Sequence, residues 1–96
     1  MEYSDIKELE SLCRNVDSLS DKIKLLERFI GYIKEPDRYR FTLSCRTSAY
    51  AYDVDWIRVS GEDLIDLLTV LDVKIKKHMH DREDMIKKIE EFYERK

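Results

Sequence analysis

The feature that most constrains this chain is a row of apolar residues near its beginning, spaced alternately three and four residues apart. This spacing keeps one stripe of side chains on the same side of a helix over four consecutive heptads. A helix with such a stripe must bury it against another helix along its length. We therefore predict a seam for helix pairing and self-association, made of Leu9, Leu12, Val16, Leu19, Ile23, Leu26, Ile30 and Ile33.

The seam predicts one helix over about residues 4–35. Ser4 is a residue type that caps helix starts, and Pro36 cannot continue a helix. Ser18 and Asp21 have the spacing of a capping box, so a break near Ser18 is an alternative. Because the seam keeps its phase through this position, we favour one continuous helix.

The hydrophobic period changes from helical to alternating between residues 38 and 59, which predicts two strands. The apolar positions of the two strands are Tyr39, Phe41, Leu43 and Cys45, followed by Tyr50, Tyr52, Val54 and Trp56. A tight connection near residues 47–49 would join them as a hairpin. The expected register pairs Tyr39 with Trp56, Phe41 with Val54 and Leu43 with Tyr52, and on the other face Arg40 with Asp55 and Thr42 with Asp53.

This register brings apolar residues together on one face and opposite charges together on the other. A slightly longer loop would shift the pairing by two residues and keep the same faces. Ile57 and Val59 fall on the polar side of this register, where they would mark a bulge or the transition to the next helix.

A second helix is predicted over about residues 61–95, with Ser60 and Asp63 as its capping box. Its apolar face begins with Leu64, Leu67, Leu68, Leu71 and Ile75. Two continuations are open beyond Ile75. Continued heptads place His78, Arg82, Met85, Ile89 and Phe92 in the seam. A four-residue slip instead selects Met79, Arg82, Ile86, Ile89 and Tyr93.

Together these segments predict a single α+β domain over residues 1–96 that is mainly α. Two long antiparallel helices with coiled-coil-like packing are joined by a two-stranded antiparallel hairpin, in the order α-β-β-α. A lone hairpin is barely stable in water, so its aromatic face must cover the helices or the hairpin of a second chain. We therefore expect a homo-oligomer, most simply a dimer.

The arrangement resembles the beta subunit of the prefoldin family, in which a hairpin interrupts an antiparallel coiled coil. The matching feature is the long seam of the first helix, which ends at Ile33 just before the hairpin. The resemblance implies a holdase that captures client proteins. The prefoldin pattern also implies longer helices than this chain provides.

The sequence lacks the residue patterns of enzymes and cofactor-binding proteins. His78 and His80 would point about 200° apart on a helix, so they cannot bind one metal ion together. His78 is instead a polar seam residue that could set helix register with Arg82. Glycine occurs only at positions 31 and 61, which excludes a glycine-rich phosphate loop. We expect no enzymatic activity, no cofactor and no metal.

Two further features bear on location. Cys13 follows the seam residue Leu12 and Cys45 lies in a predicted strand, so we expect both to be buried and reduced. No leader-like segment and no apolar run long enough to cross a bilayer is visible. These features predict a cytoplasmic protein that does not bind membranes.

The hairpin is the candidate site for binding a partner. Its candidate residues are Arg38, Arg40, Arg46, Tyr50, Tyr52 and Trp56. Aromatic and arginine side chains are the usual anchors of protein interfaces, and the same mixture can stack bases and contact phosphates. A third interpretation is that the aromatic residues pack on the helices and the arginines pair with Asp53 and Asp55.

We predict a small non-enzymatic protein that self-associates and binds another protein. A stoichiometric inhibitor or regulator of phage or mobile-element type fits its size. Nucleic-acid or nucleotide binding through the hairpin and a prefoldin-like holdase are the alternatives. The formal net charge of −3 does not provide the positive field of a dedicated duplex-binding protein.

Overall fold

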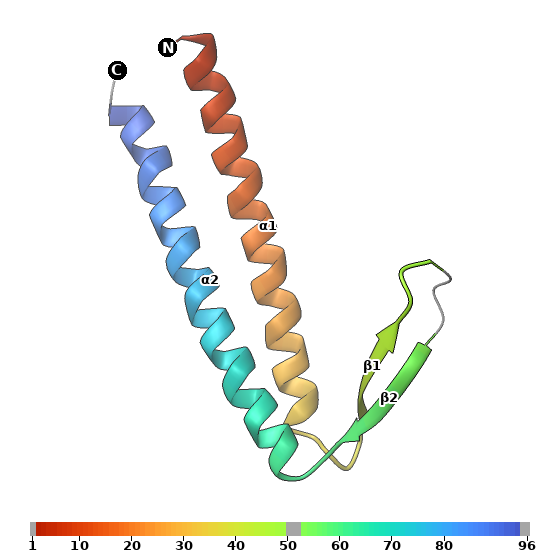
Figure 1. Ribbon diagram of the computed structural model, residues 1–96. Helices are drawn as coiled ribbons and strands as arrows, with labels where there is room; N and C mark the ends of the chain where they lie inside the picture. The colour runs from red at the N-terminus through yellow and green to blue at the C-terminus, as the bar shows by residue number, and fades with distance from the viewer. Residues whose placement is uncertain (1, 50–52, 95–96) are drawn as a thin grey trace.

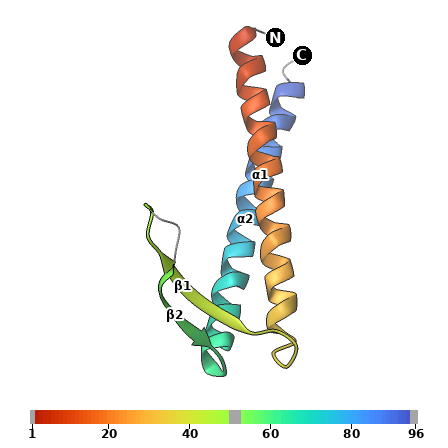
Figure 2. The same ribbon diagram turned by 90° about the vertical axis from the view of Figure 1, so that its right-hand side faces the viewer.

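The computed structural model describes residues 2–49 and 53–94 of the chain. Helix α1 (Tyr3–Ile33) is followed by strands β1 (Phe41–Arg46) and β2 (Asp53–Val59) and by helix α2 (Glu62–Glu94). The two helices run antiparallel and side by side, with the hairpin at one end of the rod and both termini at the other (Figures 1 and 2). The predicted α-β-β-α fold is confirmed.

Helix α1 is continuous, as the unbroken phase of the seam predicts. It begins one residue earlier than expected, because Glu2 rather than Ser4 is its N-cap; the backbone N–H of Glu2 donates to Asp5 Oδ2 at 3.4 Å. The helix ends at Ile33, and the N–H of Lys34 donates to the carbonyl of Ile30 at 3.1 Å. The chain therefore leaves the helix just before Pro36.

The start of α2 depends on a glycine. Gly61 directly precedes the first helical residue and has φ +59°, a left-handed conformation that glycine adopts without a Cβ clash. Ser60 lies one residue further out, and its backbone carbonyl accepts the N–H of Asp63 at 3.2 Å. The left-handed turn at Gly61 thus directs the chain from β2 into α2.

The core lies between the two helices. All eight residues of the predicted seam are buried or half-buried. The most buried side chains are Ile23 and Ile33 of α1 with Leu64, Ile75 and Phe92 of α2. Each fully buried side chain of this kind contributes about 1.5–3 kcal/mol. The partner helix that the seam requires is therefore α2 of the same chain.

The apolar pattern of α2 continues in heptads beyond Ile75, without the four-residue slip. Phe92 is buried and the other continued-heptad residues are half-buried. The residues that distinguish the slipped alternative are exposed, namely Met79, Ile86 and Tyr93. An uninterrupted α2 keeps its seam facing α1, since the two helices lie side by side along their length (Figure 1).

The predicted register of the hairpin is wrong. Phe41 lies opposite Val59 and not Val54, and the ladder continues with Leu43–Ile57, Ser44–Trp56 and Cys45–Asp55, with an irregularity between Cys45 and Arg46. The connection spans residues 47–52, longer than expected, and shifts the pairing by four residues at Arg46–Asp53. The extra residue Val54 of β2 adds a fifth, so the rest of the ladder is shifted by an odd number of residues. An odd shift exchanges the two faces of a strand.

As a result, Ile57 and Val59 join Phe41 and Leu43, and Trp56 lies on the opposite face. The β-branched residues that looked misplaced in the expected register form the apolar face together with β1. The irregularity of the ladder leaves Val54 of β2 as the extra residue opposite Cys45 and Arg46, whereas we expected a bulge near Ile57 and Val59. The predicted pairing of Leu43 with Tyr52 involves a residue outside the described part of the chain.

The hairpin projects away from the helical rod. Within the described residues, close packing joins α1 to α2 and β1 to β2, but no comparable packing joins either strand to a helix. Figures 1 and 2 show the strands diverging from α1 beyond their base. At that base Tyr39 contacts Tyr32, with ring centroids 4.8 Å apart. The radius of gyration is accordingly large, at 18.8 Å.

Candidate protein-interaction surface of the hairpin

The register gives the hairpin two chemically different faces. The first, which we call the apolar face, consists of Phe41, Leu43, Ile57 and Val59. Phe41 and Val59 are half-buried near the base, whereas Leu43 and Ile57 are 65% and 60% exposed. Such exposure is unusual for neighbouring large apolar side chains, because burying each would release apolar surface from water.

The second face, which we call the Trp56 face, consists of Thr42, Ser44, Trp56 and Arg58. Trp56 is 61% exposed and lies opposite Ser44. Its backbone N–H donates to Asp55 Oδ1 at 2.8 Å, which turns that carboxylate toward the backbone. This face therefore presents one exposed indole ring with hydroxyl and guanidinium groups beside it.

The structure gathers only part of the predicted hairpin site. Arg38 lies in the connection after α1, with its guanidinium 5.5 Å from the centroid of the Tyr39 ring. Arg40 is exposed directly before β1, and Arg46 ends that strand. Tyr50 and Tyr52 lie outside the described residues. Sequence reasoning missed the exposure of Leu43 and Ile57, because alternation alone does not tell whether a face is covered.

The expectation that the hairpin's aromatic residues form one packed face holds only at the base. Tyr39 is half-buried against Tyr32, but Trp56 is exposed. The odd register shift separates these two residues, which were expected to face each other. Of these two aromatic residues, Tyr39 therefore packs against α1, and Trp56 is accessible to a partner.

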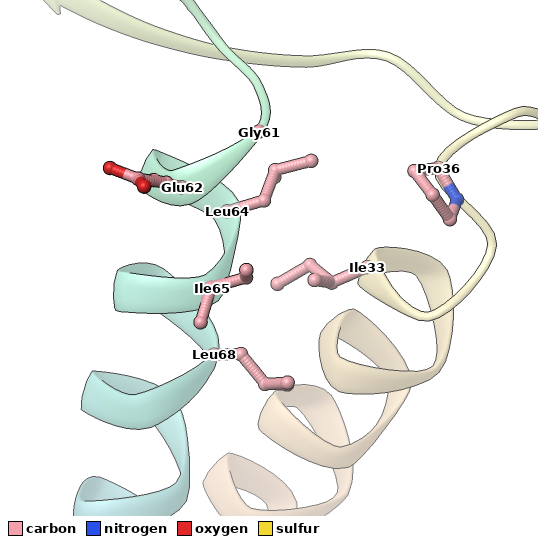
Figure 3. A pocket seen from close by; sticks show the side chains of 7 residues that line it. All are labelled: Ile33, Pro36, Gly61, Glu62, Leu64, Ile65 and Leu68. Atoms are coloured by element: carbon pink, nitrogen blue, oxygen red, sulfur yellow. The ribbon is translucent and has the colours of Figure 1, made fainter.

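An open apolar groove of about 530 Å³ lies where the hairpin meets the helices. Its lining residues are Ile33, Pro36, Gly61, Glu62, Leu64, Ile65 and Leu68. Figure 3 shows the side chain of Ile33 pointing from α1 toward Ile65 of α2, with Leu68 one turn further along α2, while Glu62 points away. The groove is a continuation of the interhelical seam that the diverging hairpin leaves uncovered.

The polar residues of the seam are only partly satisfied. Arg82 Nη1 donates to Ser20 Oγ at 3.3 Å and so links α2 to α1. His78 is half-buried, and its Nδ1 is buried without a hydrogen-bond partner within the described residues. His80 lies outside the seam, with Nε2 3.4 Å from Asp84 Oδ2.

The expectation that both cysteines are buried is wrong: Cys13 and Cys45 are exposed free thiols. Cys13 follows the seam residue Leu12 but lies beside the seam on α1, where α2 does not cover it. Cys45 belongs to a strand over which no described helix packs closely. Both cysteines lie next to apolar residues in the sequence, but they are exposed because no described element packs over either of them.

Among residues 2–49 and 53–94, no cluster of three or more His, Cys, Asp or Glu side chains could hold a metal ion. Neither helix in the described part of the chain is long and apolar enough to cross a membrane. No family model, no curated protein and no solved structure matches this chain.

Proposed function

We propose that this protein is a non-enzymatic interaction module that self-associates and docks another protein on its hairpin. The observation that carries the proposal is the projecting hairpin, which leaves Leu43, Trp56 and Ile57 exposed. A two-stranded hairpin is marginal by itself, so a partner that covers it would stabilise both the hairpin and the complex. The small size and the unpacked hairpin suit a stoichiometric inhibitor or regulator of phage or mobile-element type.

The composition of the hairpin supports a protein partner. A tryptophan and neighbouring arginines are the side chains that most often dominate binding free energy at protein interfaces. Apolar residues beside them can exclude water from such anchors. Among the described residues the sheet consists of β1 and β2 alone, so a strand of a partner protein could add to either edge.

The test is affinity capture from native cell extract with the full chain as bait. We expect Leu43→Ser and Trp56→Ala to lose a protein that the wild-type chain retains. Val73→Ser is the matched control, because Val73 is an exposed apolar residue of α2 and not of the hairpin. If all four baits retain the same proteins, the hairpin is not the docking surface.

Single-stranded nucleic acid is the second candidate, and the Trp56 face favours it. An exposed indole beside Arg58, with Arg40 just before β1, could stack a base and contact phosphate. Trp56 is the single tryptophan of the chain, so its fluorescence reports on this face. We expect quenching by an oligonucleotide at low salt that weakens steeply as salt is added. Unchanged fluorescence at low salt would exclude this candidate.

A further inference from the structure

A second row of apolar side chains runs along α2 beside the seam. Ile65, Met79, Ile86 and Tyr93 occupy the same heptad position, and Asp72 is the one polar residue among them. Their exposed fractions are 64%, 37%, 38% and 59%. At about 1.5 Å per residue, this α2 row is about 42 Å long. It extends over most of the helix, from near the hairpin to near the C-terminus.

The α2 row lies on one definable side of the rod. Arg82, a seam residue next to this row, donates a hydrogen bond to Ser20 of α1. Ser20 therefore lies on the same side, and Ile6 and Cys13 precede it by whole heptads on α1. Ile6 and Cys13 are both exposed. The half of the rod near the termini thus has a broad apolar side formed by both helices.

The spacing in α2 is typical of a helix in a bundle rather than in a two-helix hairpin. A two-helix coiled coil needs two apolar positions per heptad, whereas helices that face a bundle core use three. The seam supplies two of these positions and the α2 row supplies the third. The third position has no covering element within the described residues, since α1 already occupies the seam.

The exposed area of the chain is also larger than a compact monomer would have. A folded monomer of 11.6 kDa exposes roughly 5,800 Å². This chain exposes 8022 Å², roughly 2,200 Å² more than that. A standard interface buries about 800 Å² per partner, and obligate dimers bury more. The excess is therefore sufficient for a stable dimer interface together with a docking surface.

We propose that a second copy of this chain packs on the α2 row, so that two helix pairs form a four-helix bundle across a two-fold axis. A row that is apolar along its length can pair with itself under two-fold symmetry. Its one polar member, Asp72, is paired with Lys76 of the same helix at 3.1 Å. The hairpin stays outside this bundle. The inference rests on the self-association in the proposed function and assigns it a surface.

The first test is the mass of the full chain in solution, measured by light scattering at about 10–100 μM. We expect the wild-type chain to have twice its mass of 11.6 kDa. Ile86→Glu places a charge in the α2 row and should weaken dimerisation at least 100-fold, with helicity by circular dichroism unchanged. Val73→Glu is the matched control, because Val73 is 61% exposed on the side of α2 opposite the seam. It should remain a dimer.

The second test is crosslinking, which does not depend on weakening the dimer. In a Cys13→Ser, Cys45→Ser background, Met79→Cys, at the middle of the α2 row, should give a covalent dimer with a short bismaleimide, and Val73→Cys should give none. A wild-type monomer at 100 μM, or a dimer that survives Ile86→Glu, would overturn the inference. If Leu43→Ser abolishes dimerisation and Ile86→Glu does not, the dimer interface lies on the hairpin, and the inference is also overturned. An intact α2-row dimer with no hairpin-dependent capture would contradict only the docking proposal.

Discussion

At the scale of single residues, the two glycines of the chain have opposite roles. Gly61 has φ +59°, where an L-residue is strained by about 1–2 kcal/mol, and Gly31 lies inside α1. We expect Gly61→Ala to lower the free energy of unfolding by about that amount. Gly31→Ala should raise it by up to about 1 kcal/mol, because no side chain crowds the position. Urea unfolding measures both, and equal effects of the two substitutions would refute this account.

His78 is the polar residue whose position in the seam has the clearest energetic consequence. Its Nδ1 is buried without a partner within the described residues, and an unsatisfied buried polar group costs about 1–3 kcal/mol. We therefore expect His78→Leu to raise the free energy of unfolding by about 1–2 kcal/mol at pH 7. His80→Leu is the control: His80 is exposed, and this substitution should change stability by less than about 0.5 kcal/mol. A destabilised His78→Leu chain would indicate a polar contact that the imidazole makes.

At the scale of elements, the hydrophobic periodicity of the sequence was sufficient to predict the helices but not to predict how the strands of the hairpin pair. A three-four spacing that holds phase from Leu9 to Ile33 specifies a helix, its buried side and the need for a second helix. The strand register instead depends on the loop and on a bulge. The longer connection shifts the pairing by four residues, and the extra residue Val54 of β2 adds a fifth, which moves Trp56 from the apolar face to the opposite one. Alternation alone therefore predicted the two strands but not which of their residues form the candidate site.

The register has a direct chemical test. Leu43 and Ile57 lie opposite each other on the apolar face, at the Cα separation of adjacent antiparallel strands, which suits a disulfide. In a Cys13→Ser, Cys45→Ser background, we expect Leu43→Cys with Ile57→Cys to oxidise within one chain in dilute solution. Leu43→Cys with Trp56→Cys should not, because those side chains point to opposite faces. Mass spectrometry after digestion distinguishes the products, and the reverse result would restore a register of the other parity.

At the scale of the whole molecule, the antiparallel helix pair was predictable but the projecting hairpin was not. The antiparallel order follows from a hairpin that brings two helix ends together. The angle between hairpin and rod is set instead by the short connections at Pro36 and Gly61, whose conformations leave no periodic signal. For the same reason the exposure of Leu43 and Ile57 could not be read from their spacing. Whether an apolar face is buried depends on elements distant in the sequence, and a second chain can also bury it.

The last prediction concerns the shape of a single chain, which can be measured on the Ile86→Glu variant. If that chain is a folded monomer, small-angle scattering should give a radius of gyration near the 18.8 Å of the single-chain structure. A compact 96-residue domain would give roughly 12.5 Å. The difference arises because the molecule extends 55 Å along its longest axis and the hairpin does not fold back on the helices. A value clearly below 18.8 Å, with helicity retained, would mean that the hairpin closes onto the helices, and the exposed hairpin faces would then no longer support docking.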